Sequence, residues 1–370
     1  MAAGLCLRAV RAFLNPAVRR DDEFRGIFSA DDYRAVNSFY DSQPFFAATP
    51  LLNYQRLAAA LDIGRLMVKD ESARFGLQAF KSLGARYAME RLLGHALKGG
   101  VVCATAGNHG RAVARAAADM GLECTVFVPA MSGEAEDVER RVRDHRIAGM
   151  RADGARVVEV AGTYEEAVAM AAARARTHGS AVISDTGWPG YEQIPRDIMA
   201  GYTRLFTEAS RQWNDPPDVV LVQGGVGGLV CAAASWFAFT AGGARPYLIA
   251  CEPDGAACLL ESARAGSPVQ LSSVRTSMAG LRCATPSAAA WPAIRDGIDA
   301  FVAIPDSFAA LAMSRLSARG GDPFIEAGPS GACGVGALLA LKDEAAFQPV
   351  QDACGLGRST RVLAVVTEGK

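Results

Sequence analysis

The sequence is poor in the residues from which metal centres and disulfide scaffolds are built. Its nine cysteines are spread over 370 residues without a C-x-x-C pair, and none of its four histidines stands in an H-E-x-x-H arrangement. This pattern excludes the common zinc and iron–sulfur frameworks, and the cysteines are too dilute to staple a small fold. We therefore expect a reduced, cytoplasmic protein that holds no metal.

Long apolar runs and a charge bias are also missing. No apolar run approaches the roughly 20 residues that span a bilayer, and 38 Lys and Arg balance 39 Asp and Glu. We therefore expect no membrane partner and no nucleic-acid partner. Apolar residues make up 50% of the chain, enough for sizeable cores, and the length indicates two domains at about 150 residues each.

Short apolar runs alternate with Ala-rich stretches of helical length. Val, Ile and Leu dominate the runs without strict alternation, which is typical of strands covered on both faces. This alternation predicts an α/β fold with mostly parallel sheets. The expected strands are 66–68, 101–104, 125–128, 156–160, 181–184, 219–222, 248–251, 301–304 and 362–366. The expected helices include 112–120, 165–177, 229–239 and 332–341, with an exposed helix within 130–155.

Two glycine-containing turns follow expected strands, at residues 105–110 and 224–228. Gly224, Gly225, Val226, Gly227 and Gly228 would let backbone N–H groups approach an anion, and the following helix adds its positive end. A phosphate would suit this loop, although a plain tight turn has the same composition. The loop is neither a Walker A motif nor a G-x-G-x-x-G dinucleotide fingerprint, although a nucleotide-binding α/β protein stays an alternative.

Lys81 follows Phe80 and opens a stretch of small and apolar residues. Most lysines are solvated surface charges, and that reading applies to any lysine taken at random. A lysine at a helix start beside apolar neighbours can instead have a lowered pKa and supply a free amine for a Schiff base.

In their order and spacing, these features resemble the fold-type II pyridoxal-phosphate enzymes, which include threonine and serine dehydratases, cysteine synthase and the tryptophan synthase β subunit. Within that group the chain resembles the diaminopropionate ammonia-lyase family. The matching segments are 68–72, 74–77, 107–111, 185–188, 190–191, 194–195, 252–254, 278–281 and 367–369.

The resemblance implies a role for each part of the cofactor site. Lys81 would hold pyridoxal 5'-phosphate as a Schiff base, Asn108 would bond the 3'-hydroxyl, and the loop 224–228 would bind the phosphate. Thr367 would place a neutral hydroxyl near the pyridine nitrogen, which suits elimination over transamination. Thr105, Ala106 and Gly107 would bind the substrate carboxylate.

Asp185 ends an expected strand, where an aspartate either caps a turn or serves as a general base. The lyase family carries a matching Asp and a second Asp at the position of Ala106 here, and the two serve opposite faces of the substrate. Because Ala106 cannot transfer a proton, we expect selectivity for one stereoisomer, the L form handled by Asp185, or a different amino acid. The freed Lys81 amine is the alternative base.

The resemblance also implies a fold and an activity. We expect a large cofactor-binding domain from residues 1–81 and 190–370, a small mobile domain from 82–189, and a homodimer. The expected reaction is α,β-elimination of 2,3-diaminopropionate to pyruvate and ammonia. A dehydratase or β-eliminating lyase on serine, threonine or another β-substituted amino acid is the alternative, and a non-catalytic cofactor-binding protein is a further one. Cys258 and Cys283 lie in segments where the family carries cysteines, and either a disulfide or two buried thiols would fit, with thiols favoured.

Overall fold

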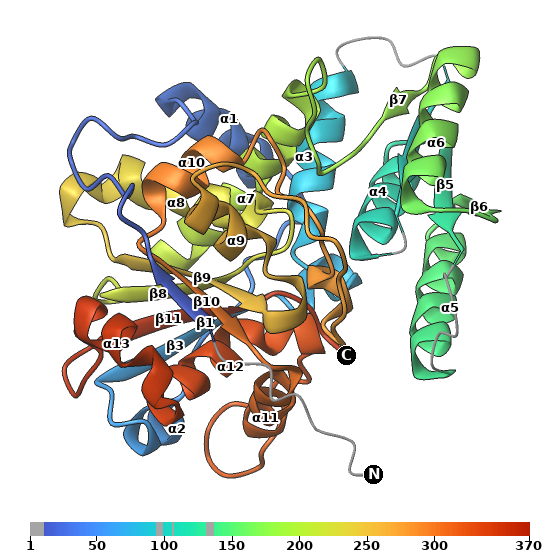
Figure 1. The fold of residues 1–370 in the computed structure, drawn as a ribbon. Coiled ribbons are helices and arrows are strands. Elements are labelled where there is room, and N and C mark those ends of the chain that lie inside the picture. Colours follow the sequence, from blue (N-terminus) through green and yellow to red (C-terminus); the bar gives the residue numbers. More distant parts are fainter. Residues whose placement is uncertain (1–10, 94–98, 106, 131–136) are drawn as a thin grey trace.

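The computed structural model describes residues 11–93, 99–105, 107–130 and 137–370. These residues form two separate sheets, each covered by helices (Figure 1). The smaller sheet, with α4, α5 and α6, occupies one side of the molecule, and the larger sheet occupies the other. In this part of the chain, we find no helix with the length and apolar character needed to cross a bilayer.

The larger sheet has seven strands in the order β1-β10-β9-β8-β11-β3-β2. Its five central strands run parallel, whereas the edge strands β1 and β2 pair antiparallel with their neighbours. The strands are β1 (Arg11–Leu14), β2 (Leu51–Asn53), β3 (Arg65–Asp70), β8 (Val219–Gln223), β9 (Tyr247–Pro253), β10 (Ala300–Ile304) and β11 (Arg361–Val366).

The smaller sheet has four parallel strands in the order β6-β5-β4-β7. Its strands are β4 (Val101–Ala104), β5 (Cys124–Pro129), β6 (Arg156–Val160) and β7 (Ala181–Val182). All nine strands expected from the apolar runs are therefore present, and the α/β class is confirmed. The expected division at residues 82 and 189 stays a prediction.

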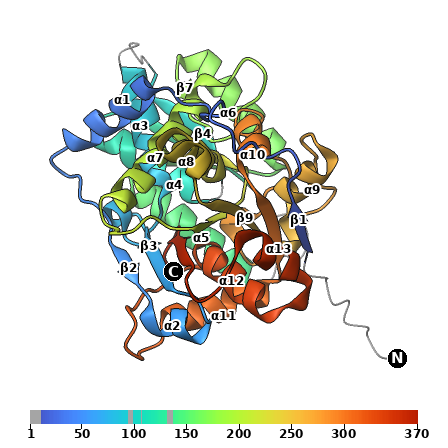
Figure 2. The same ribbon diagram turned by 90° about the vertical axis from the view of Figure 1, so that its left-hand side faces the viewer.

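Helices cover both faces of the larger sheet (Figure 2). The helices α8 and α12 are buried along almost their whole length because their Ala- and Gly-rich sequences pack closely against strands. The helices are α1 (Ala30–Asp41), α2 (Gln55–Ala60), α3 (Lys81–Leu93), α4 (Asn108–Asp119), α5 (Asp137–Ala152), α6 (Tyr164–His178), α7 (Gln193–Ser210), α8 (Gly228–Ala241), α9 (Cys258–Ala265), α10 (Trp291–Gly297), α11 (Asp306–Leu316), α12 (Pro329–Asp343) and α13 (Gln348–Cys354).

A buried network of charges joins β3, the segment that follows it, and α7. Glu208 accepts from Lys69 Nζ at 3.0 Å and from Arg74 Nη2 at 2.8 Å. Arg74 also bonds Glu71 at 2.7 Å, and Thr49 Oγ1 donates to Glu71 at 2.6 Å. Because buried charges are tolerated only when they are paired, this network fixes the path of the chain toward Lys81.

Candidate active site

A cleft of about 2410 Å³ lies at the carboxyl ends of the strands of both sheets. In open parallel sheets this edge is where ligands bind, because the loops there are free of helix packing. The turns that line the cleft place seven residues, each from the end of a different strand. They are Thr105 after β4, Ala130 after β5, Asp185 after β7, Gly225 after β8, Asp254 after β9, Pro305 after β10 and Thr367 after β11.

Lys81 is the first residue of α3 and lines this cleft. The segment before it is held in an uncommon conformation, with φ of 51° at Phe75 and 61° at Gln78. Such left-handed backbone at non-glycine residues persists only where the surroundings fix it. Two bonds to the segment after β11 do so, from Phe80 N to Thr367 O at 3.1 Å and from Gly369 N to Gln78 O at 2.8 Å.

The Lys81 ammonium donates a hydrogen bond to the Asp185 carboxylate. Burial opposes the charge on Lys81, but Asp185 outweighs it and raises the pKa of the amine. Burial likewise opposes the charge on Asp185, but Lys81, followed by His109, lowers the pKa of this carboxyl well below its usual range. Two groups that the sequence places far apart therefore form one charged pair that can exchange a proton.

The loop that carries Asp185 is anchored by Tyr191. The Tyr191 hydroxyl accepts from Ser184 N at 3.0 Å and donates to Val182 O at 2.7 Å. The Tyr191 ring stacks on Trp188 with ring centroids 4.2 Å apart. The Tyr191 hydroxyl thus bonds the last residue of β7 and the residue just before Asp185, which fixes the loop that carries the Asp185 carboxylate.

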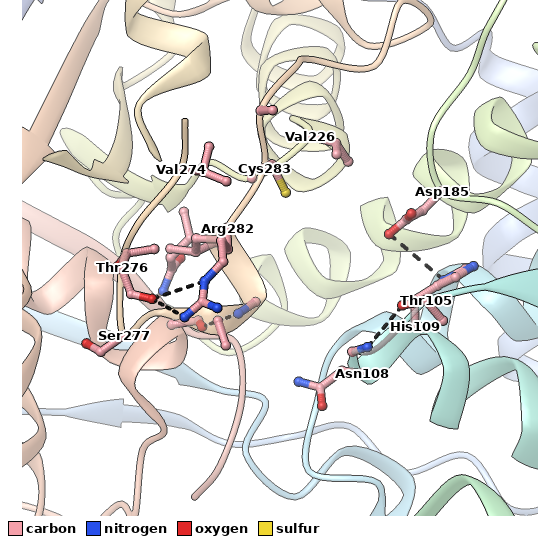
Figure 3. Close-up of a pocket in the computed structure, with 18 of the residues that line it drawn as sticks. Thr105, Asn108, His109, Asp185, Val226, Val274, Thr276, Ser277, Arg282 and Cys283 are labelled. Carbon is pink, nitrogen blue, oxygen red and sulfur yellow. Dashed lines mark hydrogen bonds and ion pairs between the residues drawn. The ribbon is translucent and has the colours of Figure 1, made fainter. Parts of the chain in front are cut away.

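The turn after β4 leads into α4. Thr105 Oγ1 accepts from Gly107 N at 3.0 Å, so this amide already has a partner. Asn108 donates through Nδ2 to the Glu368 carboxylate, which also lies 3.7 Å from Arg146 Nη2. Figure 3 shows the Asn108 side chain pointing into the cleft, away from His109. Ala106, the remaining expected residue of this turn, lies outside the described residues.

The glycine loop after β8 is the part of the cleft best suited to a phosphate. The amides of Gly225, Val226 and Gly227 donate to no backbone carbonyl among the described residues, although the Val226 N–H also faces the Cys283 thiol, and α8 begins directly after them. Gly227 has φ of +96°, and a Cβ at this position would lie 2.4 Å from Ile294 Cδ1. Free N–H groups at a helix start form an anion site.

Gly224 differs from the other members of this loop. Its amide donates to Cys251 O at 2.8 Å, which continues the pairing of β8 with β9, and it does not line the cleft. Thr367 does line the cleft and is buried. The structure thus brings Lys81, Asp185 and Asn108 to one cleft with Thr105, Gly107, Thr367 and residues 225–228, whereas Gly224 lies behind its wall.

These observations fit pyridoxal phosphate. The cleft offers an amine at Lys81, an amide side chain at Asn108, a hydroxyl at Thr367 and a cradle of free N–H groups that a Cβ at Gly227 would distort. These are the amine, ring contacts and phosphate cradle that the cofactor requires.

Sequence reasoning did not assign a role to several cleft residues. Glu368 bonds Asn108, and His109 lies 4.0 Å from Asp185, but their partners are remote in sequence and no local pattern indicates them. Cys258 and Cys283 are free thiols, which confirms the expectation of thiols over a disulfide, and both lie close to Gly225. Burial raises the pKa of the Cys283 thiol to about 11.

Comparison with known proteins gives the same result. A family model described as "Pyridoxal-phosphate dependent enzyme" matches residues 43–356. The curated diaminopropionate ammonia-lyase of Salmonella typhimurium is 36% identical, over 90% of this chain and 88% of that protein. The enzyme of the same name from Escherichia coli K12 is 32% identical, over 93% and 89% respectively.

A solved structure extends the similarity to the whole fold. The crystal structure of Escherichia coli diaminopropionate ammonia-lyase in complex with an aminoacrylate-PLP azomethine reaction intermediate has a TM-score of 0.86 at 31% identity. It covers 98% of this chain and 94% of its own. The chain therefore belongs to the pyridoxal-phosphate-dependent enzymes of fold type II and, within them, to the diaminopropionate ammonia-lyase family.

Proposed function

We propose that this protein catalyses the pyridoxal-phosphate-dependent α,β-elimination of 2,3-diaminopropionate, giving pyruvate and ammonia. One observation carries the proposal: the amine of Lys81 and the carboxylate of Asp185 meet in a cleft that also holds the free amides of the glycine loop. The relatives of the same family are named for this activity.

Each cleft residue has a distinct part in holding the cofactor. Lys81 would supply the amine that binds its aldehyde, Gly225 to Gly228 would hold its phosphate, Asn108 would bond its hydroxyl, and Thr367 would offer a neutral hydroxyl to its ring nitrogen. Bound pyridoxal phosphate withdraws electrons from the substrate Cα and so makes the Cα proton acidic. The Thr105 hydroxyl, which accepts from Gly107 N, would donate its hydrogen to the substrate carboxylate at this turn.

Asp185 is the base that takes the Cα proton of the substrate. Its depressed pKa keeps it ionised and ready to accept, and its contact with Lys81 allows the two groups to share the proton. Ammonia leaves from Cβ, and the remaining three-carbon product hydrolyses to pyruvate.

The substrate is the L form. Ala106 occupies the position where the family carries a second aspartate, and a methyl group cannot act as a base. D-diaminopropionate should therefore give little pyruvate, and Ala106→Asp should raise its turnover while Ala106→Ser, of similar size, should not. Rapid turnover of the D form by the unaltered enzyme would contradict this assignment.

The proposal extends to the domains of the protein, its oligomeric state and its location in the cell. Residues 82–189 form a small domain that closes over the cleft and excludes water during the reaction. The protein acts as a homodimer in the cytoplasm. Light scattering on the purified enzyme tests the dimer, since a monomeric mass would contradict it.

The central test combines labelling with turnover. Borohydride reduction followed by peptide mapping should tag Lys81, and L-diaminopropionate should yield pyruvate. Lys81→Ala should abolish both results, whereas Lys342→Ala on α12 should change neither. Pyruvate or ketobutyrate formed mainly from serine or threonine would assign the enzyme to the dehydratases. Labelled Lys81 with no turnover of any amino acid would indicate a non-catalytic protein.

A further inference from the structure

The His109 ring lies buried beside Asp185 and has no part in the elimination proposed above for Lys81 and Asp185. Its Nε2 lies 3.0 Å from Ile183 O, and a carbonyl oxygen can only accept, so Nε2 carries the hydrogen. In the neutral ring Nδ1 is therefore a bare acceptor. Only 4% of the residue is exposed, and Nδ1 has no hydrogen-bond partner in the described part of the chain.

This unpaired nitrogen faces the carboxylate. His109 Nδ1 lies 4.0 Å from Asp185 Oδ2. Figure 3 marks this approach of the two side chains with a dashed line. Two acceptors without a hydrogen between them cannot bond each other. Buried acceptors are nearly always paired in folded proteins, so this one indicates a state in which a proton arrives.

We propose that His109 is a positioning residue that receives the proton from Asp185 during turnover. The inference rests on the proposed function of Asp185 as the base. The Cα–H bond of the substrate breaks, its electron pair stays on the substrate, and the proton forms an O–H bond on Asp185. That bond breaks as Nδ1–H forms, giving a carboxylate and an imidazolium whose Nε2–H stays on Ile183 O.

The surroundings keep the His109 ring neutral at rest and keep Asp185 ionised. The titratable groups that face the pair are Lys81 from α3, Tyr202 from α7, Tyr164 from α6, Tyr191 from the loop after β7, Cys103 from β4 and Cys283. Burial lowers the pKa of His109, Asp185 opposes this effect, and Lys81 adds to it. The ring is thus neutral at rest and able to accept a proton.

The first test observes the ring directly and needs no catalysis. Nitrogen-15 NMR of histidine-labelled, full-length protein without cofactor should show His109 as the Nε2–H tautomer, with His109→Gln identifying its signal among the four histidines. Asp185→Asn should lower the pKa of His109, and Lys81→Ala should raise it. An Nδ1–H tautomer, or a pKa that neither variant moves, would overturn the proposal.

The second test uses the holoenzyme. His109→Gln keeps an amide N–H for Ile183 O but cannot take a proton, so kcat should fall about tenfold or more with little change in KM. In an Asp185→Asn background the same change should cost much less, because the two groups act as a unit. His145→Gln, at an exposed position of α5, should leave kcat unchanged. Equal losses in both backgrounds would show a purely structural role.

The two tests separate the possible failures. An active wild-type enzyme whose His109 is not linked to Asp185 would overturn the relay alone. A wild-type enzyme without activity on diaminopropionate, with the NMR link intact, would overturn the proposed elimination.

Discussion

At the scale of single residues, the site depends on the ion pair between Lys81 and Asp185. Lys81 at the start of α3 and Asp185 after β7 each lose solvation in the cleft, and each is kept charged by the other. A buried charge without a partner would neutralise instead. The reactivity of the lysine is therefore set by the carboxylate that faces it.

Replacing the carboxylate tests its role as the base. Asp185→Asn should lower kcat on L-diaminopropionate by about 10²- to 10⁴-fold, because general base catalysis contributes roughly this much. The cofactor absorbance should survive, since Lys81 is intact. Steady-state kinetics and a visible spectrum measure the two effects.

A matched control is Asp32→Asn. Burial opposes the charge on Asp32, but its ion pair with Arg196 and its bonds to Ser29 lower its pKa to about 2, and it lies outside the cleft. Its kcat should stay near the wild-type value. If Asp185→Asn were equally active, the Lys81 amine would be the base.

At the scale of elements, the loop between β8 and α8 joins a strand end to a helix start through three glycines and Val226. Gly224 continues the sheet, while the next three amides bond no backbone carbonyl of the described residues and lie at the positive end of a buried helix. The loop can hold this shape because Gly227 adopts a left-handed φ that side chains rarely take.

Gly227→Ala tests the loop. The added Cβ meets Ile294 and is strained at this φ, so the loop should shift and cofactor affinity should fall at least about tenfold, or ~1.4 kcal/mol. Titration of cofactor-free protein with pyridoxal phosphate measures this loss. Gly266→Ala, at φ of +72° with open space around it, should leave the affinity unchanged.

Glu252 gives the same region a pH dependence. It ends β9 beside Gly224 and accepts from Leu259 N and Leu260 N, both at 2.8 Å. Burial raises its pKa to about 8, because the two backbone N–H groups and Arg11 offset only part of the desolvation.

Between pH 4.5, the ordinary pKa of a glutamate, and about pH 8, Glu252 is therefore protonated in the folded state and ionised in the unfolded state. The free energy of unfolding should fall as pH rises through this window and level off above it. Urea unfolding from pH 5 to pH 8.5 measures the slope, and Glu252→Gln should flatten it. An unchanged slope would show that Glu252 is ionised throughout.

At the scale of the whole molecule, the two sheets meet through helices and through the charges buried beneath the cleft. The helix α3, which carries Lys81, packs against α7 from the larger sheet and α4 from the smaller one. Glu208 on α7 bonds both Lys69 and Arg74 on the chain that leads to α3. Global stability and the position of Lys81 are thus linked.

Glu208→Gln should destabilise the protein by about 3–5 kcal/mol, because it leaves two buried cations, Lys69 and Arg74, with Glu71 as their one remaining counter-charge. Chemical denaturation measures the loss. Asp62→Asn removes one partner of the exposed pair with Arg358 and should cost no more than about 1 kcal/mol. Similar effects of the two substitutions would show that water reaches the network around Glu208.

The sequence by itself determined the nine strands that lie between helices, the position of Lys81 at a helix start and the glycine loop, but its prediction of a lowered pKa for Lys81 was wrong because Asp185 raises it. These features are local: an unbroken apolar run covered on both faces, or glycines directly after a strand, has the same meaning wherever the strand is placed. The edge strands β1 and β2 were missed because they lie within the N-terminal part, where no clear pattern stands out.

Only the tertiary structure decided which side chains meet. Lys81 and Asp185 are 104 positions apart, and Asn108 and Glu368 are 260 apart. Their contacts depend on the order of strands in two sheets, which no local pattern encodes. The same order places Gly224 behind the cleft wall and turns the unpaired nitrogen of His109 toward Asp185, because burial and hydrogen bonding are settled only when distant elements pack.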